Sequence, residues 1–271
     1  MRSQWEGLLQ NLGIWDGSFT QVSTEGILLQ DTPSVVILEG RNNNQTVYQS
    51  VERFPPTEAP ERKIELEYTS IDRYLIFFDN GDFARGSSYY SAFGVFGSEF
   101  GLIDRERRLR FVILYDRDRL DKITVIREHL RDSNQPENPL LTADQLLGTW
   151  SGEIVTHYAD GRARQQSRTT LSIRREGDRI GYTLELEGAS LQSTGTVEGN
   201  MVNFTGGRQP VRLLLLPDGG SIAAPVTIES GKPFFIEVGW LRSATERSRL
   251  IRYYDERGSW STASLITERK Q

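Results

Sequence analysis

The chain is built from two similar halves, because the same short motifs occur twice and in the same order. A Gly-x-Trp-x-Gly pentad surrounds Trp15 and occurs again around Trp150. The separation between paired motifs then grows slowly along the chain, up to the last pair, Glu128 and Glu268, as duplication followed by small loop insertions would produce. A repeat of this length exceeds the unit of a solenoid, so each copy should be a whole domain. The remaining pairs are Asn80-Gly81 with Asp218-Gly219, Glu99-Phe100-Gly101 with Glu237-Val238-Gly239, and Tyr115-Asp116 with Tyr254-Asp255.

A polar segment separates the two copies. It contains Pro136 and Pro139 and shows no hydrophobic periodicity, which is typical of an extended linker. The sequence therefore predicts a first domain at residues 1–132, a linker at residues 133–140 and a second domain at residues 141–271. Each half is long enough to close a hydrophobic core of its own.

Alternating apolar and polar residues predict β-strands in both copies. Residues 63–68 and 182–187 alternate without interruption, which is the pattern of a sheet with one buried and one solvated face. Turns rich in Gly and Asn recur roughly every eight to twelve residues, and no stretch between them is long enough for a helical crossover. The predicted fold class is all-β, with antiparallel meanders that close as barrels or pair as sandwiches. Capping boxes at Ser3-x-x-Glu6 and Thr142-x-x-Gln145 predict a short helix at the start of each copy.

The balance of charges argues against two classes of partner. Lys+Arg number 32 and Asp+Glu 37, a net charge of −5, and the two signs are interleaved along the chain. Nucleic acids and anionic membranes require a clustered basic surface, so we expect neither partner. The longest aliphatic runs, Val35–Leu38 and Leu213–Leu216, are far shorter than the roughly 20 residues of a membrane helix, so we expect no membrane insertion. The first residues also lack the apolar segment of a signal peptide, and we therefore expect a cytoplasmic protein.

The sequence contains no motif for catalysis or metal binding. Because there is no cysteine, neither a thiolate nucleophile nor a zinc–thiolate site can form. His129 and His157 lie in unrelated places, and neither has a second ligand at metal spacing. Glu99 and Glu237 occupy equivalent positions, but a carboxylate pair that works as acid and base must share one pocket, and these lie in different domains. We therefore predict no catalytic residue, no metal site and no required cofactor, and favour a function that is not enzymatic.

Four segments carry a resemblance to a known fold family. A helical turn that runs into Gly-x-Trp on the first strand of a meander resembles the calycin superfamily, which includes the lipocalins. The whole chain resembles an uncharacterised family of tandem lipocalin-like proteins from cyanobacteria and plants, related by fold to the lyases that deliver bilins to phycobiliproteins. The resemblance implies two up-and-down barrels, each closed at one end by a tryptophan, here Trp15 and Trp150. The four segments are residues 9–15, 146–150, 211–218 and 233–240.

The same resemblance implies a basic residue on the last strand of each barrel, packed over the tryptophan. Arg127 is the candidate in the first copy. Its register partner in the second copy is Thr267, and the basic residue there is Arg269. The two copies therefore differ at this position.

A cluster of aromatic residues in the first copy is the candidate ligand site. One residue in every three from Tyr74 to Phe100 is aromatic, against 10% of the chain, and such rings stack on flat conjugated ligands. Arg110, on the penultimate strand, is expected to bind a ligand carboxylate by a bidentate ion pair. The simpler alternative for the rings is a packed aromatic core. For the arginines it is a solvated outer face or pairing with Glu99 or Glu237, which the cost of burying an unpaired cation favours. The candidate residues are Phe77, Tyr89, Tyr90, Phe96, Phe100, Arg110 and Tyr115 in the first copy and Arg249 and Tyr254 in the second.

Three functions are compatible with the sequence. The first is a non-catalytic barrel that binds a hydrophobic small molecule, with a tetrapyrrole such as a bilin as the candidate and the ring-rich first copy as the binding half. The second is a chromophore transfer factor similar to the bilin lyases; without cysteine, a bilin cannot be attached to this chain by a thioether. The third is an interaction scaffold whose barrels are filled with side chains. The fold does not choose among them, whereas an empty barrel interior would favour binding.

Overall fold

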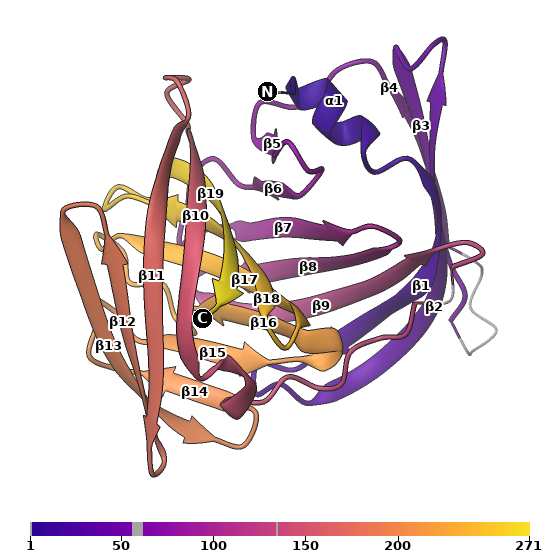
Figure 1. Cartoon of the computed structure of the whole chain (residues 1–271). Helices are drawn as coiled ribbons and strands as arrows, with labels where there is room; N and C mark the ends of the chain where they lie inside the picture. Colours follow the sequence, from indigo (N-terminus) through magenta and orange to yellow (C-terminus); the bar gives the residue numbers. More distant parts are fainter. Residues whose placement is uncertain (1, 56–61, 134) are drawn as a thin grey trace.

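The computed structural model of the protein describes residues 2–55, 62–133 and 135–271. It contains two curved antiparallel β-sheets, one from each sequence copy (Figure 1). Nearly all strands that are consecutive in the chain are neighbours in a sheet, so both sheets are meanders, as the alternating pattern predicts. The predicted all-β fold with a short helical element at the start of each copy is confirmed, and the second of these elements is a single 3-10 turn. None of the described helices has the length and apolar character needed to cross a membrane.

The first half forms a nine-stranded sheet with the order β4-β3-β2-β1-β9-β8-β7-β6-β5. Helix α1 (Gln4–Leu9) precedes it and begins at the predicted capping box, in which Ser3 and Glu6 bond to each other's backbone N–H groups. The strands are β1 (Gly13–Val22), β2 (Leu28–Arg41), β3 (Thr46–Arg53), β4 (Arg62–Tyr68), β5 (Leu75–Phe77), β6 (Phe83–Gly86), β7 (Val95–Asp104), β8 (Arg107–Asp116) and β9 (Arg119–Leu130).

The second half forms a closed barrel, in which β19 pairs back with β10. Two 3-10 turns, η1 (Asp144–Leu146) and η2 (Pro217–Gly219), accompany the strands. The strands are β10 (Gly148–Tyr158), β11 (Gln165–Glu176), β12 (Arg179–Leu186), β13 (Ala189–Glu198), β14 (Met201–Phe204), β15 (Val211–Leu215), β16 (Gly220–Ala224), β17 (Phe234–Ser243), β18 (Glu246–Tyr254) and β19 (Trp260–Lys270).

Closure is the main difference between the two halves. In the second half β14 pairs with β13 on one side and with β15 on the other, which completes the ring. Strand β15 corresponds to β5, because each directly precedes the repeated Asp-Gly or Asn-Gly turn. Between β4 and β5 the described chain supplies no strand, so the first sheet is curled but open. The first of the two predicted barrels is therefore realised as a half-barrel.

Helix α1 lies at one end of the gap between β4 and β5 (Figure 1). The side-chain amide of Gln4 accepts a hydrogen bond from the Phe77 N–H at 2.7 Å and donates one to the Phe77 carbonyl at 2.9 Å, at the free edge of β5. The ring of Trp5 meets that of Tyr68, at the end of β4, edge-on at 6.5 Å. Helix α1 thus provides hydrogen-bond partners for part of the β5 edge and leaves most backbone groups of the β4 edge without a neighbouring strand.

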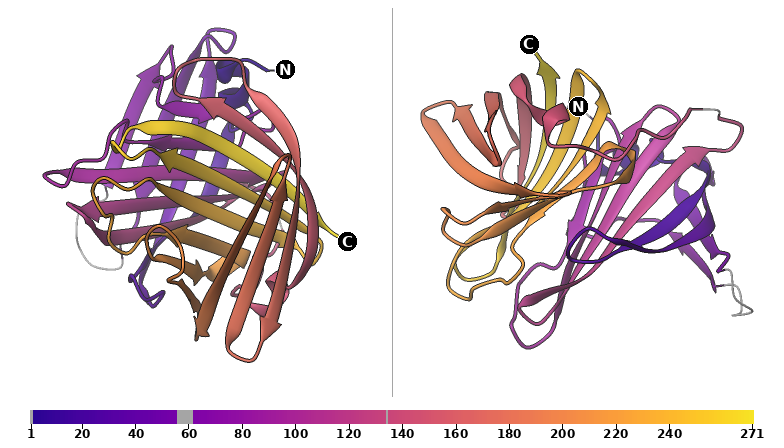
Figure 2. Two further views of the ribbon diagram at one scale, coloured as in Figure 1. Left: turned by 90° about the vertical axis from the view of Figure 1, so that its left-hand side faces the viewer. Right: turned by 90° about the horizontal axis from the view of Figure 1, so that it is seen from below.

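The two halves lie side by side (Figure 2), and the largest hydrophobic cluster contains residues of both. It joins the outer face of β7 and β8 to the outer face of β16, β17 and β18. Phe96 of the first half lies 5.0 Å from the ring of Tyr254 in the second, and Phe234 stacks on Tyr254 at 4.8 Å. Smaller clusters surround Trp15 and Trp150 inside their own sheets. The expectation that each half closes a core of its own is therefore incomplete, because the halves pack back to back and share a third core.

Polar contacts fix the segment between the halves. Asp218 adopts φ 59° in the turn between β15 and β16, accepts a hydrogen bond from the Asn138 N–H at 2.7 Å, and pairs with the buried Arg107 of β8. Burial raises the pKa of Asp218 to about 6, although Arg107 opposes the shift. A further bond of 3.0 Å joins the Gly219 N–H to the Pro139 carbonyl. Residues 135–140 thus contain no helix or strand, as predicted for the linker, but are held against the second half.

Candidate ligand-binding site

Four charged side chains form a buried network inside the first half. Arg108 and Arg110 alternate along β8, so both lie on the concave face of the sheet, which also holds Trp15. Glu128 of β9 accepts hydrogen bonds from Arg108 Nε at 2.7 Å and from Arg110 Nη2 at 2.8 Å. Glu99 of β7 accepts one from Arg110 Nη1 at 2.9 Å. A single buried carboxylate thus bridges two guanidinium groups, and a second carboxylate completes the coordination of Arg110.

The second half contains the same network at the equivalent positions. Glu268 of β19 accepts hydrogen bonds from Arg247 Nε and from Arg249 Nη2, both at 2.8 Å. Arg249 Nη1 lies 3.1 Å from Glu237 Oε2 on β17. The Arg-x-Arg motif and its two glutamates recur with nearly the same separation as the other repeated motifs. The network therefore belongs to the unit that was duplicated.

The buried arginines hold the carboxylates in their ionised form. Burial alone would raise the pKa of Glu128, but the charges of Arg108 and Arg110 outweigh it and lower the pKa to about 2. The pKa of Glu268 is lowered in the same way, against its own burial. Since Arg110 and Arg249 already bind two carboxylates each, they are poorly placed to bind a ligand carboxylate as well. The ion-pair interpretation of these two arginines is therefore confirmed.

Trp15 and Trp150 lie near the start of β1 and β10, and both are almost completely buried. Each indole N–H donates a hydrogen bond of 2.9 Å to a backbone carbonyl just before the first strand. The guanidinium of Arg108 lies 4.3 Å from the ring centre of Trp15, and that of Arg247 lies 4.8 Å from the ring of Trp150. A cation from the penultimate strand therefore covers the tryptophan in both halves, and the same cation takes part in the buried network.

The basic residues expected over the tryptophans lie elsewhere. Arg127 points to the outer face of β9, where it pairs with Asp31 at 2.9 Å. Arg269 is exposed and pairs with Glu246 at 2.9 Å. The assignment of the covering cation to Arg127 or Arg269 is therefore wrong, although another basic residue of the last strand, Lys270, lies 5.1 Å from the ring centre of Trp150. The repeat did contain the correct signal, because the arginines at the start of the two penultimate strands occupy equivalent positions.

Most of the aromatic candidates lie in the core shared by the two halves. Phe96, Phe100, Tyr115 and Tyr254 are fully buried there, and Tyr90 packs against Phe96 at 5.5 Å. These rings alternate with Glu99, Arg110 and Arg249 of the concave-face networks and therefore point to the outer face of their own sheet. This corrects the expectation that they line a barrel interior. The alternative of a packed aromatic core describes them.

Two further aromatic candidates lie outside the shared core. Phe77 belongs to the inner cluster of the first half, where its ring packs 5.4 Å from that of Phe83. Tyr89 is 56% exposed and forms an isolated bridge to Ser259 of the second half. The structure therefore does not bring the ring-rich stretch of the first copy together around one cavity.

An apolar cavity of about 480 Å³ lies inside the second barrel. Tyr182 and Phe204 form part of its wall and meet edge-on at 5.3 Å. Burial raises the pKa of Tyr182 to about 12, so its hydroxyl stays protonated and able to donate a hydrogen bond. Arg249 and Glu237, paired with each other, and the exposed Arg208 supply the charged part of the lining. The aliphatic lining residues include Leu171, Leu184, Leu191, Val211 and Leu213.

The sequence indicated the first copy as the binding half because of its rings, whereas this cavity lies in the second. The rings fill the space between the halves, and the aliphatic strands of the second copy surround an unfilled interior. Of the predicted site residues, Arg249 lines the cavity. Its other lining residues carry the plain alternation of β-strands, which does not reveal whether an interior is filled.

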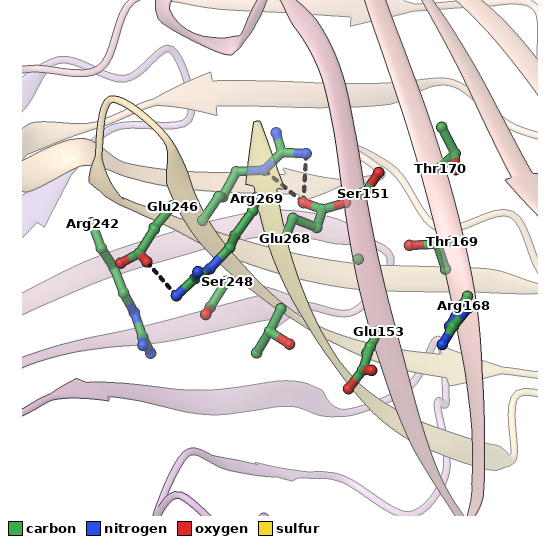
Figure 3. Close-up of a pocket in the computed structure, with 13 residues that line it drawn as sticks. Ser151, Glu153, Arg168, Thr169, Thr170, Arg242, Glu246, Ser248, Glu268 and Arg269 are labelled. Atoms are coloured by element: carbon green, nitrogen blue, oxygen red, sulfur yellow. Dashed lines mark hydrogen bonds and ion pairs between the residues drawn. The ribbon is translucent and has the colours of Figure 1, made fainter. Parts of the chain in front are cut away.

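A second hollow, of about 740 Å³, lies beside β10, β11, β18 and β19 (Figure 3). Its lining mixes both charges and several hydroxyls, and four of the charged groups form ion pairs with each other. Glu246 pairs with Arg269 at 2.9 Å, and Glu268 with Arg247 at 2.7 Å. Across the described residues, no group of three or more His, Cys, Asp and Glu side chains is arranged to hold a metal ion. We regard this hollow as a solvated surface and the interior of the second barrel as the better candidate site.

Two antiparallel meanders in tandem, one of them closed around an apolar cavity, define a class of double β-barrel-like proteins. The chain belongs to the DUF3598 family, which confirms the resemblance found in the sequence. Residues 1–133 match the family described as "Domain of unknown function (DUF3598), N-terminal". Residues 137–271 match the family described as "Biogenesis factor required for ATP synthase 1, C-terminal domain".

One solved structure supports this assignment. A protein of unknown function from the DUF3598 family of Nostoc punctiforme PCC 73102 is 40% identical, with 100% of each chain covered and a TM-score of 0.93. An S-type phycobiliprotein lyase from Guillardia theta is 12% identical, over 48% of this chain and 90% of the lyase, with a TM-score of 0.39. The similarity to the lyase is too low to carry information on function. A search of the curated protein sequences gives no match.

Proposed function

We propose that the protein is a non-catalytic binding protein that takes part in the assembly of the ATP synthase. The observation that carries the proposal is the match of residues 137–271 to a family described as the C-terminal domain of an ATP synthase biogenesis factor. The structure is compatible with such a role, because the two bridging glutamates and the arginines that flank them are consumed in ion pairs. The back-to-back packing also fixes the position of one sheet relative to the other. A rigid arrangement of two sheets suits a protein that binds large partners.

Deletion of the gene in the organism that encodes the chain tests this proposal. We expect the amount of assembled ATP synthase to fall severalfold on native gels, while the messenger RNAs of its subunits stay unchanged. The tagged protein should co-purify with one or more ATP synthase subunits and bind the purified subunit at micromolar concentration. Unchanged levels of assembled enzyme, together with no binding to any purified subunit, would contradict the proposal.

A second candidate function is the binding of a hydrophobic small molecule, and the cavity inside the second barrel favours it. A volume of about 480 Å³ is within the usual range of ligand pockets. Of the two guanidinium groups in its wall, that of Arg249 is neutralised by glutamates, and the wall offers the Tyr182 hydroxyl and the exposed Arg208 guanidinium as donors. The chemistry therefore favours a largely apolar ligand with a small polar or anionic group. The tetrapyrrole or bilin expected from the sequence stays a proposal to be compared with such a ligand.

Titration of the purified protein with biliverdin, phycocyanobilin, a fatty acid and a neutral isoprenoid separates these ligands. Trp fluorescence and visible absorbance report binding. We expect Leu184→Trp, which fills the cavity, to weaken a bound ligand at least tenfold, and Val51→Trp, at the equivalent position of the open half, to leave it unchanged. No saturable signal with any ligand would rule out the small-molecule function. A bound bilin that passes to an apophycobiliprotein would favour chromophore transfer.

A further inference from the structure

The first half has an open strand edge where the second half has a complete ring. Strand β4 pairs with β3 on one side, and within the described residues no strand pairs with its other side. The equivalent strand of the second half, β13, pairs with both β12 and β14. The correspondence follows from the cross-strand pairs. Trp15 pairs with Val36, Val36 with Val51, and Val51 with Ile64. The same series of pairs connects Trp150 to Leu191 in the second half. An unpaired edge presents a row of backbone donors and acceptors to any extended chain.

We propose that the edge of β4 binds an extended segment of a partner protein, which adds a strand to the first sheet. The second half shows what such a segment looks like, since β14 (Met201–Phe204) fills the equivalent side of the ring. Within β14, Val202 is buried and points inward with Phe204, while the alternate residues point outward. The proposal rests on the assembly function, because it supplies the mode by which a protein partner is held.

The concave face of β4 favours an apolar side of the incoming strand. Ile64 is 46% and Leu66 is 52% exposed, although both lie on the same face as the buried Trp15 and Val36. Aliphatic side chains are stabilised when an adjacent strand packs against them. A segment with aliphatic residues at alternate positions would pack beside Ile64 and Leu66, as Val202 of β14 packs beside Val197 of β13.

The outer face of β4 favours a basic side of the incoming strand. Its charged residues and those of the neighbouring strands include two cations and four carboxylates, a net charge of −2. Lys63 pairs with Glu52 and Glu65, both at 3.2 Å, so the cations are already engaged. Charge on an edge strand discourages pairing with other acidic strands, and it attracts a strand whose outward residues are Lys or Arg. The six residues are Arg41, Lys63, Glu39, Glu52, Glu65 and Glu67.

The occupant is therefore an extended peptide in which aliphatic and basic residues alternate. A second copy of this chain is a poorer occupant, because it would bring two acidic outer faces together. Helix α1 does not compete for the site, because its Gln4 forms hydrogen bonds with β5 and its Trp5 contacts β4 at Tyr68, the last residue of that strand. Residues 62–67 are therefore left for the peptide.

The probe is a capped eight-residue peptide of alternating Val and Lys with a fluorescent label, compared with the same peptide carrying Glu in place of Lys. We expect the Val–Lys peptide to bind the full-length protein saturably and at least tenfold more tightly than the Val–Glu peptide. Leu66→Asp should weaken binding at least tenfold. Leu28→Asp is the matched control, because Leu28 is 54% exposed on β2, outside the part of that strand that pairs with β3, and it should change binding less than twofold.

Ile64→Asp provides a second edge variant, and thermal melts establish that all three variants are folded. Hydrogen exchange should show new protection of the β4 amides when the peptide binds. Absence of saturable binding, an equal effect of Leu28→Asp, or unprotected β4 amides would overturn the proposal. Concentration-dependent dimers that Leu66→Asp abolishes would also overturn it, in favour of a second copy. If ATP synthase subunits bind Leu66→Asp as tightly as the wild type, the docking edge is wrong while the assembly function stands.

Discussion

The two halves of the molecule share their buried motifs and differ in closure. Both place a tryptophan, two arginines and two glutamates at the same positions of the inner face. The second half continues with β14 and closes, whereas the first has α1 beside β5 and stays open. The duplicated motifs therefore determine how one side of each sheet is built, and the segment between the fourth strand and the Asn-Gly or Asp-Gly turn determines whether the sheet closes.

Separation of the halves should have the largest effect. The barrel of residues 137–271 is closed and has its own inner cluster, so we expect it to unfold cooperatively alone. Residues 1–133 lose the partner of their outer face, and an open sheet without that face should show no cooperative melt. Circular dichroism melts of both fragments, alone and mixed, measure this. A first fragment that melts alone at the temperature of the full chain would contradict the importance of the shared core.

Removal of either buried tryptophan should be the next largest effect. Trp15→Ala and Trp150→Ala each remove a ring that is almost completely buried and covered by an arginine, at a cost of about 3–5 kcal/mol in the free energy of unfolding. Trp150→Ala should lie at the upper end, because a closed barrel relaxes less around a cavity. Urea denaturation gives the values, and the partly exposed Tyr253→Ala serves as control. An unchanged urea midpoint for Trp15→Ala would show that this ring does not stabilise the open half.

Neutralisation of the bridging glutamates should cost slightly less. Glu128→Gln and Glu268→Gln each leave two buried guanidinium groups without their shared counter-ion, and we expect losses of about 3 kcal/mol at pH 7. Glu246→Gln, on an exposed pair, should change stability by less than about 0.5 kcal/mol. Equal values for Glu128→Gln and Glu246→Gln would mean that the network carries no more than a surface ion pair.

The bridging glutamate also predicts a pH dependence. The pKa of Glu128 is lowered to about 2 in the folded protein, below that of the unfolded chain, so its stabilisation is present above about pH 5 and is lost as the pH falls toward 2. Glu128→Gln should remove this part of the acid dependence. If wild type and variant lose stability in parallel over that range, the carboxylate is not ion-paired in solution.

Asp218 should produce a smaller effect of the opposite sign. Its folded pKa of about 6 lies above the unfolded value, so the folded state binds more protons and stability falls as the pH rises from about 4 through 6. Asp218→Asn should remove this decline, which amounts to less than about 3 kcal/mol. Unfolding free energies of both proteins at pH 4, 5, 6 and 7 test it. A wild type that declines no more than the variant would place the carboxyl in a solvated turn.

The sequence predicts the repeated architecture because its anchors are local: the Gly-x-Trp-x-Gly pentads, the alternating strands and the turns. The ion-pair alternative for Arg110 and Arg249 was also accessible, because their glutamate partners repeat with them. The open edge of β4 and the shared core were not, since both depend on which face of a strand meets a distant one. Phe96 and Tyr115 carry the same alternation whether they point into a barrel or onto another sheet.

Hydrogen exchange of the full-length protein tests the central difference between the halves most directly. The open-edge account predicts that outward-facing amides of β4 (Arg62–Tyr68) exchange at least a hundredfold faster than those at equivalent positions of β13 (Ala189–Glu198), because β13 is paired on both sides and β4 on one. Amides on the β3 side of β4 should stay protected and serve as the internal reference. Equal protection of β4 and β13 on both sides would show that the first sheet is closed in solution, and would contradict both the open half-barrel and its proposed docking edge.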